Sequence, residues 1–212
     1  MIKKTETSGW RQARRRSARD AIVEAAWALV REEGLAGLSL RDLARRAGIS
    51  PPTVYAYFDS KNAIYDAMFG AAAAQFAGRM AEPYACEDPR ELLVAGARRF
   101  AAFCTSDLER YQLLFQRCVP GFEPSPQSYA PALRALDGAR EVLALNGITD
   151  ARYLDLWTAL ITGLVSQQVS NDPGGGRWTA LIEELVAMFL SHCQPAARPF
   201  APSPARPEGA LS

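Results

Sequence analysis

The most constraining feature of the sequence is the segment from Ser39 to Lys61, SLRDLARRAGISPPTVYAYFDSK, which predicts two short helices joined by a tight turn. Ser39 and Asp42 form a capping-box pattern at the start of the first helix. Gly48 stands where a helix ends in the left-handed conformation, and Ser50 followed by proline is typical of a new helix start. The apolar residues recur at helical spacing, namely Leu40, Leu43, Ala44 and Ala47, followed by Val54 and Phe58.

Two helices joined by a short turn that contains glycine are typical of a helix-turn-helix unit, whose second helix enters the DNA major groove. The free face of the second helix carries small, hydroxylated and aromatic residues, which suit contacts with base edges and phosphate oxygens. The predicted DNA-contacting residues are Ser39, Ser50, Pro51, Pro52, Thr53, Tyr55, Ala56, Tyr57 and Lys61. An ordinary helical hairpin with solvated polar residues would produce the same pattern.

The segments that flank this unit extend the pattern over three consecutive helices. The helix DAIVEAAWALVREEG precedes SLRDLARRAGIS, and TVYAYFDSK leads into a helix rich in aliphatic residues. From Ala18 to about Phe69 the sequence resembles the TetR family of bacterial transcriptional regulators. The resemblance implies sequence-specific binding to double-stranded DNA, and it implies that Lys61 contacts a phosphate, as the matching lysine commonly does in the family.

Charge is spread unevenly along the 212 residues, whose net charge is only +1. Residues 1–61 contain 12 Lys and Arg against 7 Asp and Glu, whereas the remainder contains 12 against 16. A basic end joined to an acidic body is typical of a DNA-binding unit with a separate effector-binding body. A basic tail that is simply solvated would produce the same asymmetry.

Metal, catalytic and membrane chemistry have little support in the sequence. The cysteines (Cys86, Cys104, Cys118 and Cys193) lack CxxC spacing and His192 is the single histidine, so we expect no metal, no cofactor and cysteines that act as small core residues. The lack of a nucleophile–base pair argues against an enzyme. With no secretion signal and no run of about twenty apolar residues, a cytoplasmic protein without a membrane partner is expected.

The two ends of the chain are predicted to differ from the rest. Residues 1–16 are expected to form a flexible basic arm, which either follows the DNA backbone or makes no specific contact. Ser17 and Asp20 form a second capping-box pattern, which predicts that the first helix begins there and runs to Gly34. Residues 195–212 contain five prolines and are expected to be disordered.

The fold class is predicted to be all-α, with about nine helices: a three-helix helix-turn-helix domain over residues 17–62, followed by a helical ligand-binding and dimerisation domain over residues 63–194. The expected helices of the second domain are 61–80, 89–104, a short one opened by Ser106 or Asp107, 130–145, 151–170 and 178–193. The Pro-rich segment VPGFEPSPQSYAP between the third and fourth of these is expected to be a loop.

Aromatic residues in the second domain are more numerous than a plain helix bundle requires, which indicates either an apolar ligand cavity or ordinary core packing. The predicted ligand-binding residues are Phe100, Phe103, Tyr111, Leu114, Phe115 and Trp157. The family resemblance implies that the last two long helices pair with those of a second subunit. The predicted dimerisation residues are Trp157, Leu160, Leu164, Leu181, Leu185 and Phe189.

These features predict a homodimeric repressor that a small apolar molecule releases from a palindromic operator. An activator, or a DNA-binding protein that responds to no ligand, has the same sequence features. The operator and the effector are not defined by the residues.

Overall fold

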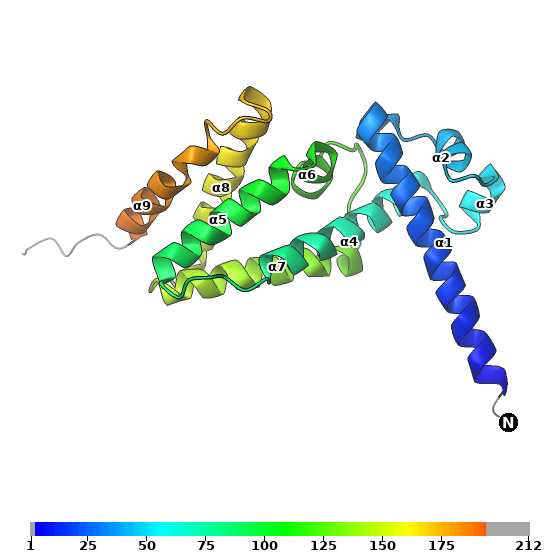
Figure 1. The fold of residues 1–212 in the computed structure, drawn as a ribbon, viewed down its shortest axis with the longest axis horizontal. Coiled ribbons are helices and arrows are strands. Elements are labelled where there is room, and N and C mark those ends of the chain that lie inside the picture. Colours follow the sequence, from blue (N-terminus) through cyan, green and yellow to red (C-terminus); the bar gives the residue numbers. More distant parts are fainter. Residues whose placement is uncertain (1–2, 194–212) are drawn as a thin grey trace, which may run out of the picture.

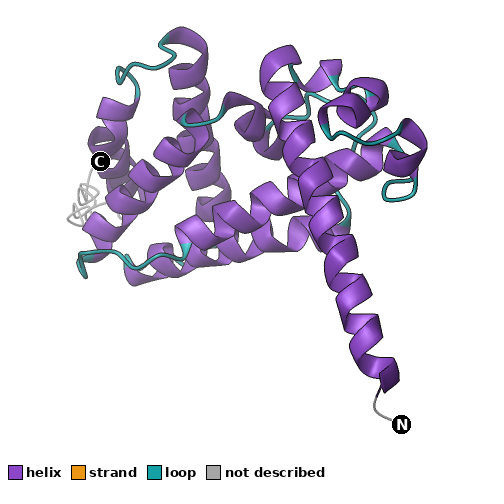
Figure 2. Ribbon diagram, turned by 45° about the vertical axis from the view of Figure 1, so that its right-hand side comes forward, coloured by secondary structure: helices purple, strands orange, loops and turns teal. Residues whose placement is uncertain are grey.

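The computed structural model describes residues 3–193, and every regular element in that range is a helix (Figures 1 and 2). The predicted all-α class is therefore confirmed, whereas the predicted Pro-rich tail lies outside the described residues. The elements are α1 (Lys3–Glu33), the 3-10 helix η1 (Leu35–Gly37), α2 (Leu40–Arg46), α3 (Pro51–Tyr55), α4 (Lys61–Met80), α5 (Pro89–Thr105), α6 (Leu108–Phe115), α7 (Pro126–Leu145), α8 (Ala151–Asn171), the 3-10 helix η2 (Thr179–Leu181) and α9 (Ile182–Cys193).

Serine hydroxyls cap three of the helix starts that the sequence predicts. Ser39 accepts a hydrogen bond from the backbone N–H of Asp42 at 3.4 Å, and Ser60 accepts one from Ala63 at 3.1 Å. Ser50 caps α3 in the same way, with the N–H of Thr53 at 3.4 Å. These bonds satisfy N–H groups that have no partner inside the helix, so the borders of α2, α3 and α4 are set locally.

The first helix begins much earlier than the sequence patterns predict. The expected flexible arm at residues 1–16 is wrong from Lys3 onward, because α1 is continuous from Lys3 to Glu33. Residues 3–33 contain no proline and are rich in Arg, Lys, Glu and Ala, which have high helix propensity. A helix that has already formed continues through Ser17 and Asp20, so the capping box at those residues is not used.

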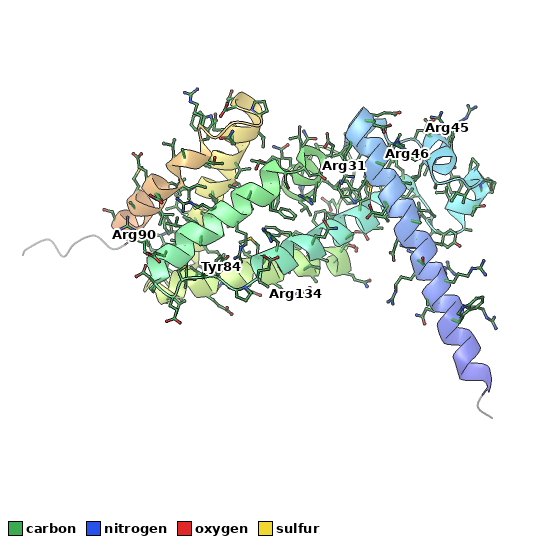
Figure 3. All side chains as sticks on the ribbon, in the orientation of Figure 1. Arg31, Arg45, Arg46, Tyr84, Arg90 and Arg134 are labelled. Atoms are coloured by element: carbon green, nitrogen blue, oxygen red, sulfur yellow. The ribbon has the colours of Figure 1, made fainter. Side chains whose placement is uncertain are left out.

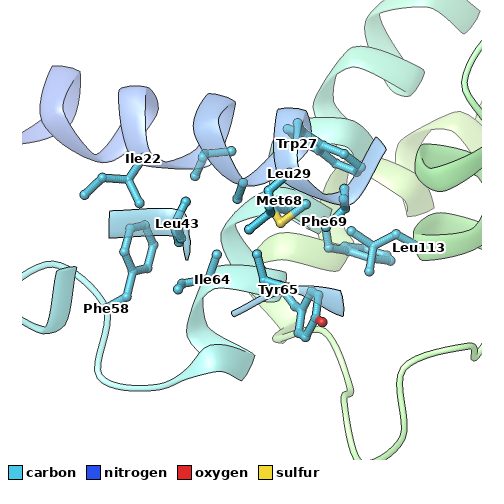
Figure 4. Packing of buried hydrophobic residues seen from close by; sticks show 14 of the residues in the cluster. Ile22, Trp27, Leu29, Leu43, Phe58, Ile64, Tyr65, Met68, Phe69 and Leu113 are labelled. Atoms are coloured by element: carbon cyan, nitrogen blue, oxygen red, sulfur yellow. The ribbon is translucent and has the colours of Figure 1, made fainter. Parts of the chain in front are cut away.

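The helix-turn-helix core packs beneath α1, as Figure 4 shows for Ile22, Leu29, Leu43, Phe58 and Met68. Tyr65 of α4 fixes the edge of this core, because its hydroxyl donates a hydrogen bond to the carbonyl oxygen of Leu35. Burial raises the pKa of Tyr65 to about 12, so the hydroxyl keeps its proton at neutral pH. The same core contacts the body through Leu113 of α6.

Helices α4 and α7 lie side by side (Figures 1 and 2) and approach closely at Gly70. A Cβ atom on Gly70 would lie only 3.0 Å from the hydroxyl of Ser128. Asp66 of α4 accepts hydrogen bonds from the N–H of Ser125 at 2.6 Å and from the hydroxyls of Ser125 and Ser128, both at 2.9 Å. The helix that joins the DNA-binding unit to the body is therefore attached to the start of α7.

The segment predicted to be a loop is partly helical, because α7 begins at Pro126 and not at about residue 130. Ser125 caps the helix, and the first helical position tolerates proline because its missing N–H has no partner there. Pro131 lies inside α7. Unlike Pro126, Pro131 lies beyond the first turn, where a proline removes a hydrogen bond to the carbonyl four residues earlier at a cost of about 3 kcal/mol, which the packing of α7 has to offset.

A second core lies between α5, α6, α7, α8 and α9. Its polar centre is Gln168 of α8, which is fully buried and accepts hydrogen bonds from the backbone N–H groups of Trp178 at 2.9 Å and Thr179 at 3.2 Å. The single helix predicted for residues 178–193 is consequently divided into η2 and α9. A glutamine that bonds two successive N–H groups holds the chain in a tight turn before α9 starts.

Three further expectations concern metals, membranes and cysteines. Within residues 3–193, no group of His, Cys, Asp and Glu side chains is arranged to hold a metal ion, and no helix has the length and apolar character that crossing a membrane requires. The expectation that the cysteines act as core residues is wrong for Cys118, which is exposed and whose thiol donates to the carbonyl of Gln112 at 3.5 Å. Cys104 is buried, and Cys86 and Cys193 are half-buried.

Candidate DNA-binding site

Helix α3 is held to the core by one face and presents the other to solvent. Val54 and Phe58, four residues apart, are buried in the core of the helix-turn-helix unit. Pro51, Pro52 and Ala56 are exposed, and Tyr55 is 52% exposed although it is a large aromatic residue. An exposed aromatic ring beside two exposed prolines gives a rigid surface that can approach a groove.

The start of α3 carries two hydroxyl groups that are already ordered. The side chains of Ser50 and Thr53 are hydrogen-bonded to each other at 2.8 Å. Ser50 is exposed and Thr53 is half-buried, so both oxygen atoms lie near the surface at the end of the helix that a helix-turn-helix directs toward base edges. A hydroxyl can donate and accept, so each retains capacity for a further bond.

Tyr57 and Ser39 are less exposed than the sequence pattern predicts, because both are half-buried. The ring of Tyr57 packs against the core, and its backbone carbonyl accepts a hydrogen bond from the guanidinium of Arg19 at 2.6 Å. Tyr57 follows the end of α3 and lies beside α1, where the guanidinium of Arg15 is 6.0 Å from the centre of its ring.

Lys61 opens α4, and its side chain is half-buried. Its ammonium group donates to the carbonyl of Ala36 at 3.4 Å and lies 5.6 Å from the centre of the Tyr65 ring. The ammonium is thus held beside the capped start of α4, where the backbone N–H groups also favour an anion.

Sequence reasoning missed the arginines of α2. A hollow of about 570 Å³ separates α2 from the start of α3, lined by Arg41, Asp42, Ala44, Arg45, Ile49 and Pro51. Arg41 and Arg45 are exposed, and Arg45 (labelled in Figure 3) forms an ion pair with Asp42 at 3.0 Å. The sequence does contain the signal, since these two residues lie four apart on the helix face opposite the buried Leu43.

Four of the six predicted ligand-binding residues are core residues in the structure. Phe100, Phe103, Tyr111 and Trp157 are buried. Phe76 of α4 packs edge-on against Phe100, with 5.9 Å between the ring centres. The aromatic rings therefore fill the space between these helices themselves, in the edge-to-face arrangement that aromatic pairs favour. Core packing, the alternative that the sequence left open, applies to these four residues.

An apolar groove lies next to that cluster, between α4, α6 and the start of α7, and it has a volume of about 560 Å³. Leu114 and Phe115 are the two predicted ligand-binding residues that line it. The full lining is Phe69, Leu113, Leu114, Phe115, Gln116, Arg117, Val119, Phe122, Glu123, Pro124, Pro126, Tyr129 and Leu133. Six of these thirteen residues, from Val119 to Tyr129, lie in the segment that the sequence predicts to be a loop, so the wall formed by the start of α7 could not be expected.

The predicted dimerisation residues separate into two groups. Trp157, Leu164 and Phe189 are buried inside the chain itself, so they are not available to a partner. Leu160 and Leu181 are exposed, and Leu185 is half-buried. Met188 of α9, which the sequence analysis did not select, is 66% exposed. The exposed apolar side of α8 and of α9 differs from the predicted one, because the predicted side of each helix packs into the core of the chain itself.

Comparison with known proteins places this geometry in a family. Residues 22–68 match the family described as bacterial regulatory proteins, tetR family. The tetracycline repressor protein class A from transposon 1721 of Escherichia coli is 28% identical over 171 residues, which are 78% of this chain and 73% of that protein.

Solved structures agree in fold. The regulator PfmR from Thermus thermophilus has a TM-score of 0.61 at 20% identity, over 80% of this chain and 96% of its own. FadR from Bacillus subtilis, solved with stearoyl-CoA, has a TM-score of 0.60 at 20% identity, over 81% and 97%. The chain therefore belongs to the TetR family of bacterial regulatory proteins, and it is a DNA-binding transcriptional regulator.

Proposed function

We propose that the protein is a homodimeric repressor whose two copies of α3 enter successive major grooves of a palindromic operator, and that a small apolar molecule releases it. The observation that carries the proposal is the exposed face of α3, supported from below by Val54 and Phe58. The tetracycline repressor among its relatives supports repression. The residues proposed to contact DNA are Ser39, Ser50, Pro51, Pro52, Thr53, Tyr55, Ala56, Tyr57 and Lys61, together with Arg41 and Arg45.

The proposed dimer uses the outer faces of α8 and α9. Leu160 of α8 and Met188 of α9 are exposed, and so is Leu181 of η2, which directly precedes α9. A twofold pair of these helices would bury the three residues and set two α3 helices about one DNA turn apart, roughly 34–36 Å. We propose domain limits of 17–62 for the DNA-binding unit and 63–194 for the body.

The proposed effector site is the groove between α4, α6 and α7. Its volume of about 560 Å³ suits a small molecule, and its lining is mainly apolar and aromatic. The groove adjoins Ser125, whose bonds to Asp66 attach α7 to the helix that leads to the DNA-binding unit. A molecule that separates α6 from α7 would act on this attachment, and its effect on DNA affinity equals its difference in affinity between the two states.

The experiment that tests the proposal begins with selection of DNA from a random pool, followed by gel-shift titration and footprinting of the selected duplex. A palindromic site protected by one dimer is the expected result. Failure to select any sequence, or binding that is equal for all duplexes at low salt, would contradict operator binding. A reporter gene placed behind the selected site then separates repression from activation.

Lys61 and Thr53 are predicted to make different contributions to DNA binding. Lys61→Ala should weaken binding to all duplexes by roughly three- to tenfold and lower the salt dependence by about one phosphate contact. Thr53→Val keeps the side-chain shape but removes the hydroxyl. It should change the difference in binding free energy between the preferred base and its alternatives by about 1 kcal/mol. Fluorescence anisotropy on selected and random duplexes measures both. Equal effects of the two variants on every duplex would contradict these roles.

The effector site can be probed with an apolar fluorophore such as anilinonaphthalene sulfonate and with stearoyl-CoA, the compound bound by FadR. Leu133→Glu places a charge in the groove and should weaken probe binding by about tenfold or more, because burial of a carboxylate is costly. The matched control is Leu145→Glu, since Leu145 is an exposed leucine of the same helix that does not line the groove. An equal effect of both substitutions would show that the probe binds elsewhere.

A further inference from the structure

The first helix extends well beyond the part of the chain that the family comparison covers. The family match begins at residue 22, whereas α1 begins at Lys3. Figure 1 shows this extension projecting away from both the body and the helix-turn-helix unit. The structure therefore has a projecting helical segment that the family assignment does not explain.

The extension is densely basic. Residues 9–19 contain five arginines, at positions 11, 14, 15, 16 and 19, and no acidic residue. Arg11, Arg14, Arg15 and Arg16 are exposed. Trp10 is 64% exposed, and the guanidinium of Arg14 lies 5.5 Å from the centre of its ring. Exposed arginines at this density are typical of a surface that binds a polyanion.

Two of these arginines attach the extension to the end of α3. Arg19 donates to the carbonyl of Tyr57 at 2.6 Å, and its guanidinium lies 4.3 Å from the centre of the Phe58 ring. Arg15, which is exposed, donates to the carbonyl of Ala56 at 3.4 Å. The basic surface of α1 is therefore continuous with the exposed end of the recognition helix.

The reach of the extension follows from helix geometry. The residues from Lys3 to Arg14 precede the attachment point and belong to α1. At about 1.5 Å rise per residue they extend the helix about 18 Å beyond Arg15. That distance is about half a turn of DNA, so the extension can reach backbone that α3 itself does not touch.

We propose that the arginine-rich part of this extension, residues 9–19, is a second DNA-contacting element that binds phosphates flanking the major groove occupied by α3. The inference rests on the proposed placement of α3 on DNA. Arginine presents planar, paired donors that match phosphate oxygens. DNA is favoured over a lipid surface because the side chains described for residues 9–19 form no apolar stripe; among them Trp10 is the one exposed large apolar residue.

The test compares two triple variants that remove the same charge. The first is Arg11→Gln, Arg14→Gln and Arg16→Gln, which leaves the attachment by Arg15 and Arg19 intact and retains helix propensity. The control is Arg90→Gln, Arg134→Gln and Arg177→Gln, exposed residues outside the helix-turn-helix unit, of which Figure 3 labels the first two. Circular dichroism checks that both variants remain helical.

The expected result is a loss of salt-dependent affinity in the first variant alone. Each lost phosphate contact lowers the slope of log K against log salt concentration by about 0.9, so the slope should fall by up to about three. Affinity for a duplex of about 40 base pairs that carries the selected site should fall roughly tenfold or more at about 0.1 M salt. A slope equal to that of the unmodified protein, or an equal loss in the control variant, would overturn the inference.

Trp10 provides a second measurement that a purely structural role would not change. DNA should protect it from acrylamide quenching when the duplex extends beyond the selected site, and less so when the duplex ends at that site. The Trp10→Phe variant identifies the signal. Quenching that DNA does not change would overturn the inference while leaving operator binding through α3 intact, whereas failure of the unmodified protein to bind any duplex would overturn the proposed function itself.

Discussion

The double variant Leu160→Glu, Met188→Glu is expected to be a folded monomer. It should bind the operator roughly a hundredfold or more weakly than the unmodified protein, because a monomer contacts one half-site and loses the affinity gain of bivalent binding, which is about 10²–10⁴-fold. Both residues are exposed in the single chain, at 37% and 66%, so charges there should not disturb its core. In a dimer the same carboxylates would be buried against a partner helix, at a cost that the interface cannot offset.

Sedimentation equilibrium at micromolar protein measures the first part of this result, and anisotropy with the selected duplex measures the second. The control is Leu108→Glu, Leu145→Glu, which adds equal charge at exposed leucines of α6 and α7. If the α8–α9 variant still sediments as a dimer, the proposed interface is incorrect.

Leu164→Glu, one turn further along α8, is expected to unfold the body instead of dissociating a dimer. Leu164 is 8% exposed and belongs to the second core together with Trp157 and Phe189. An unpaired carboxylate in that position should lower the free energy of unfolding by about 4 kcal/mol or more, a large part of the stability of a typical domain.

Urea titration followed by circular dichroism measures this loss. Leu164→Ala serves as the milder comparison and should cost about 2–5 kcal/mol through the cavity that it leaves. A Leu164→Glu protein that is as stable as the unmodified chain but monomeric would mean that the core-facing side of α8 has been assigned incorrectly.

Local signals accounted for much of the fold, because they act within a few residues. The hydroxyls of Ser39, Ser50 and Ser60 each bond an N–H three residues away, and Gly48 has a φ of +68°, a conformation that favours glycine. These interactions depend on neighbouring residues alone, so the helix-turn-helix unit could be predicted with its borders. The same signals misplaced the start of α1, since a capping pattern cannot interrupt a helix that already extends through it.

The body was less predictable because its contacts join residues that are distant along the chain. Whether Phe100 lines a cavity or fills a core depends on Phe76, and nothing near either residue in the sequence indicates that their rings meet. The sequence pattern does not distinguish Gln168 from a surface polar residue, because the N–H groups that it bonds, those of Trp178 and Thr179, lie ten and eleven residues away at the start of η2.

The sequence by itself determined the helical class, the capped pair of helices and the exposed residue types of α3, since caps and helical periodicity are properties of adjacent residues. Only the tertiary structure decided which sides of α8 and α9 remain free and where the apolar groove lies. It also decided that the arginines of residues 9–19 are presented on a helix that Arg19 attaches beside the end of α3. These features depend on how whole helices pack, and packing is settled by contacts between segments that lie far apart in the chain.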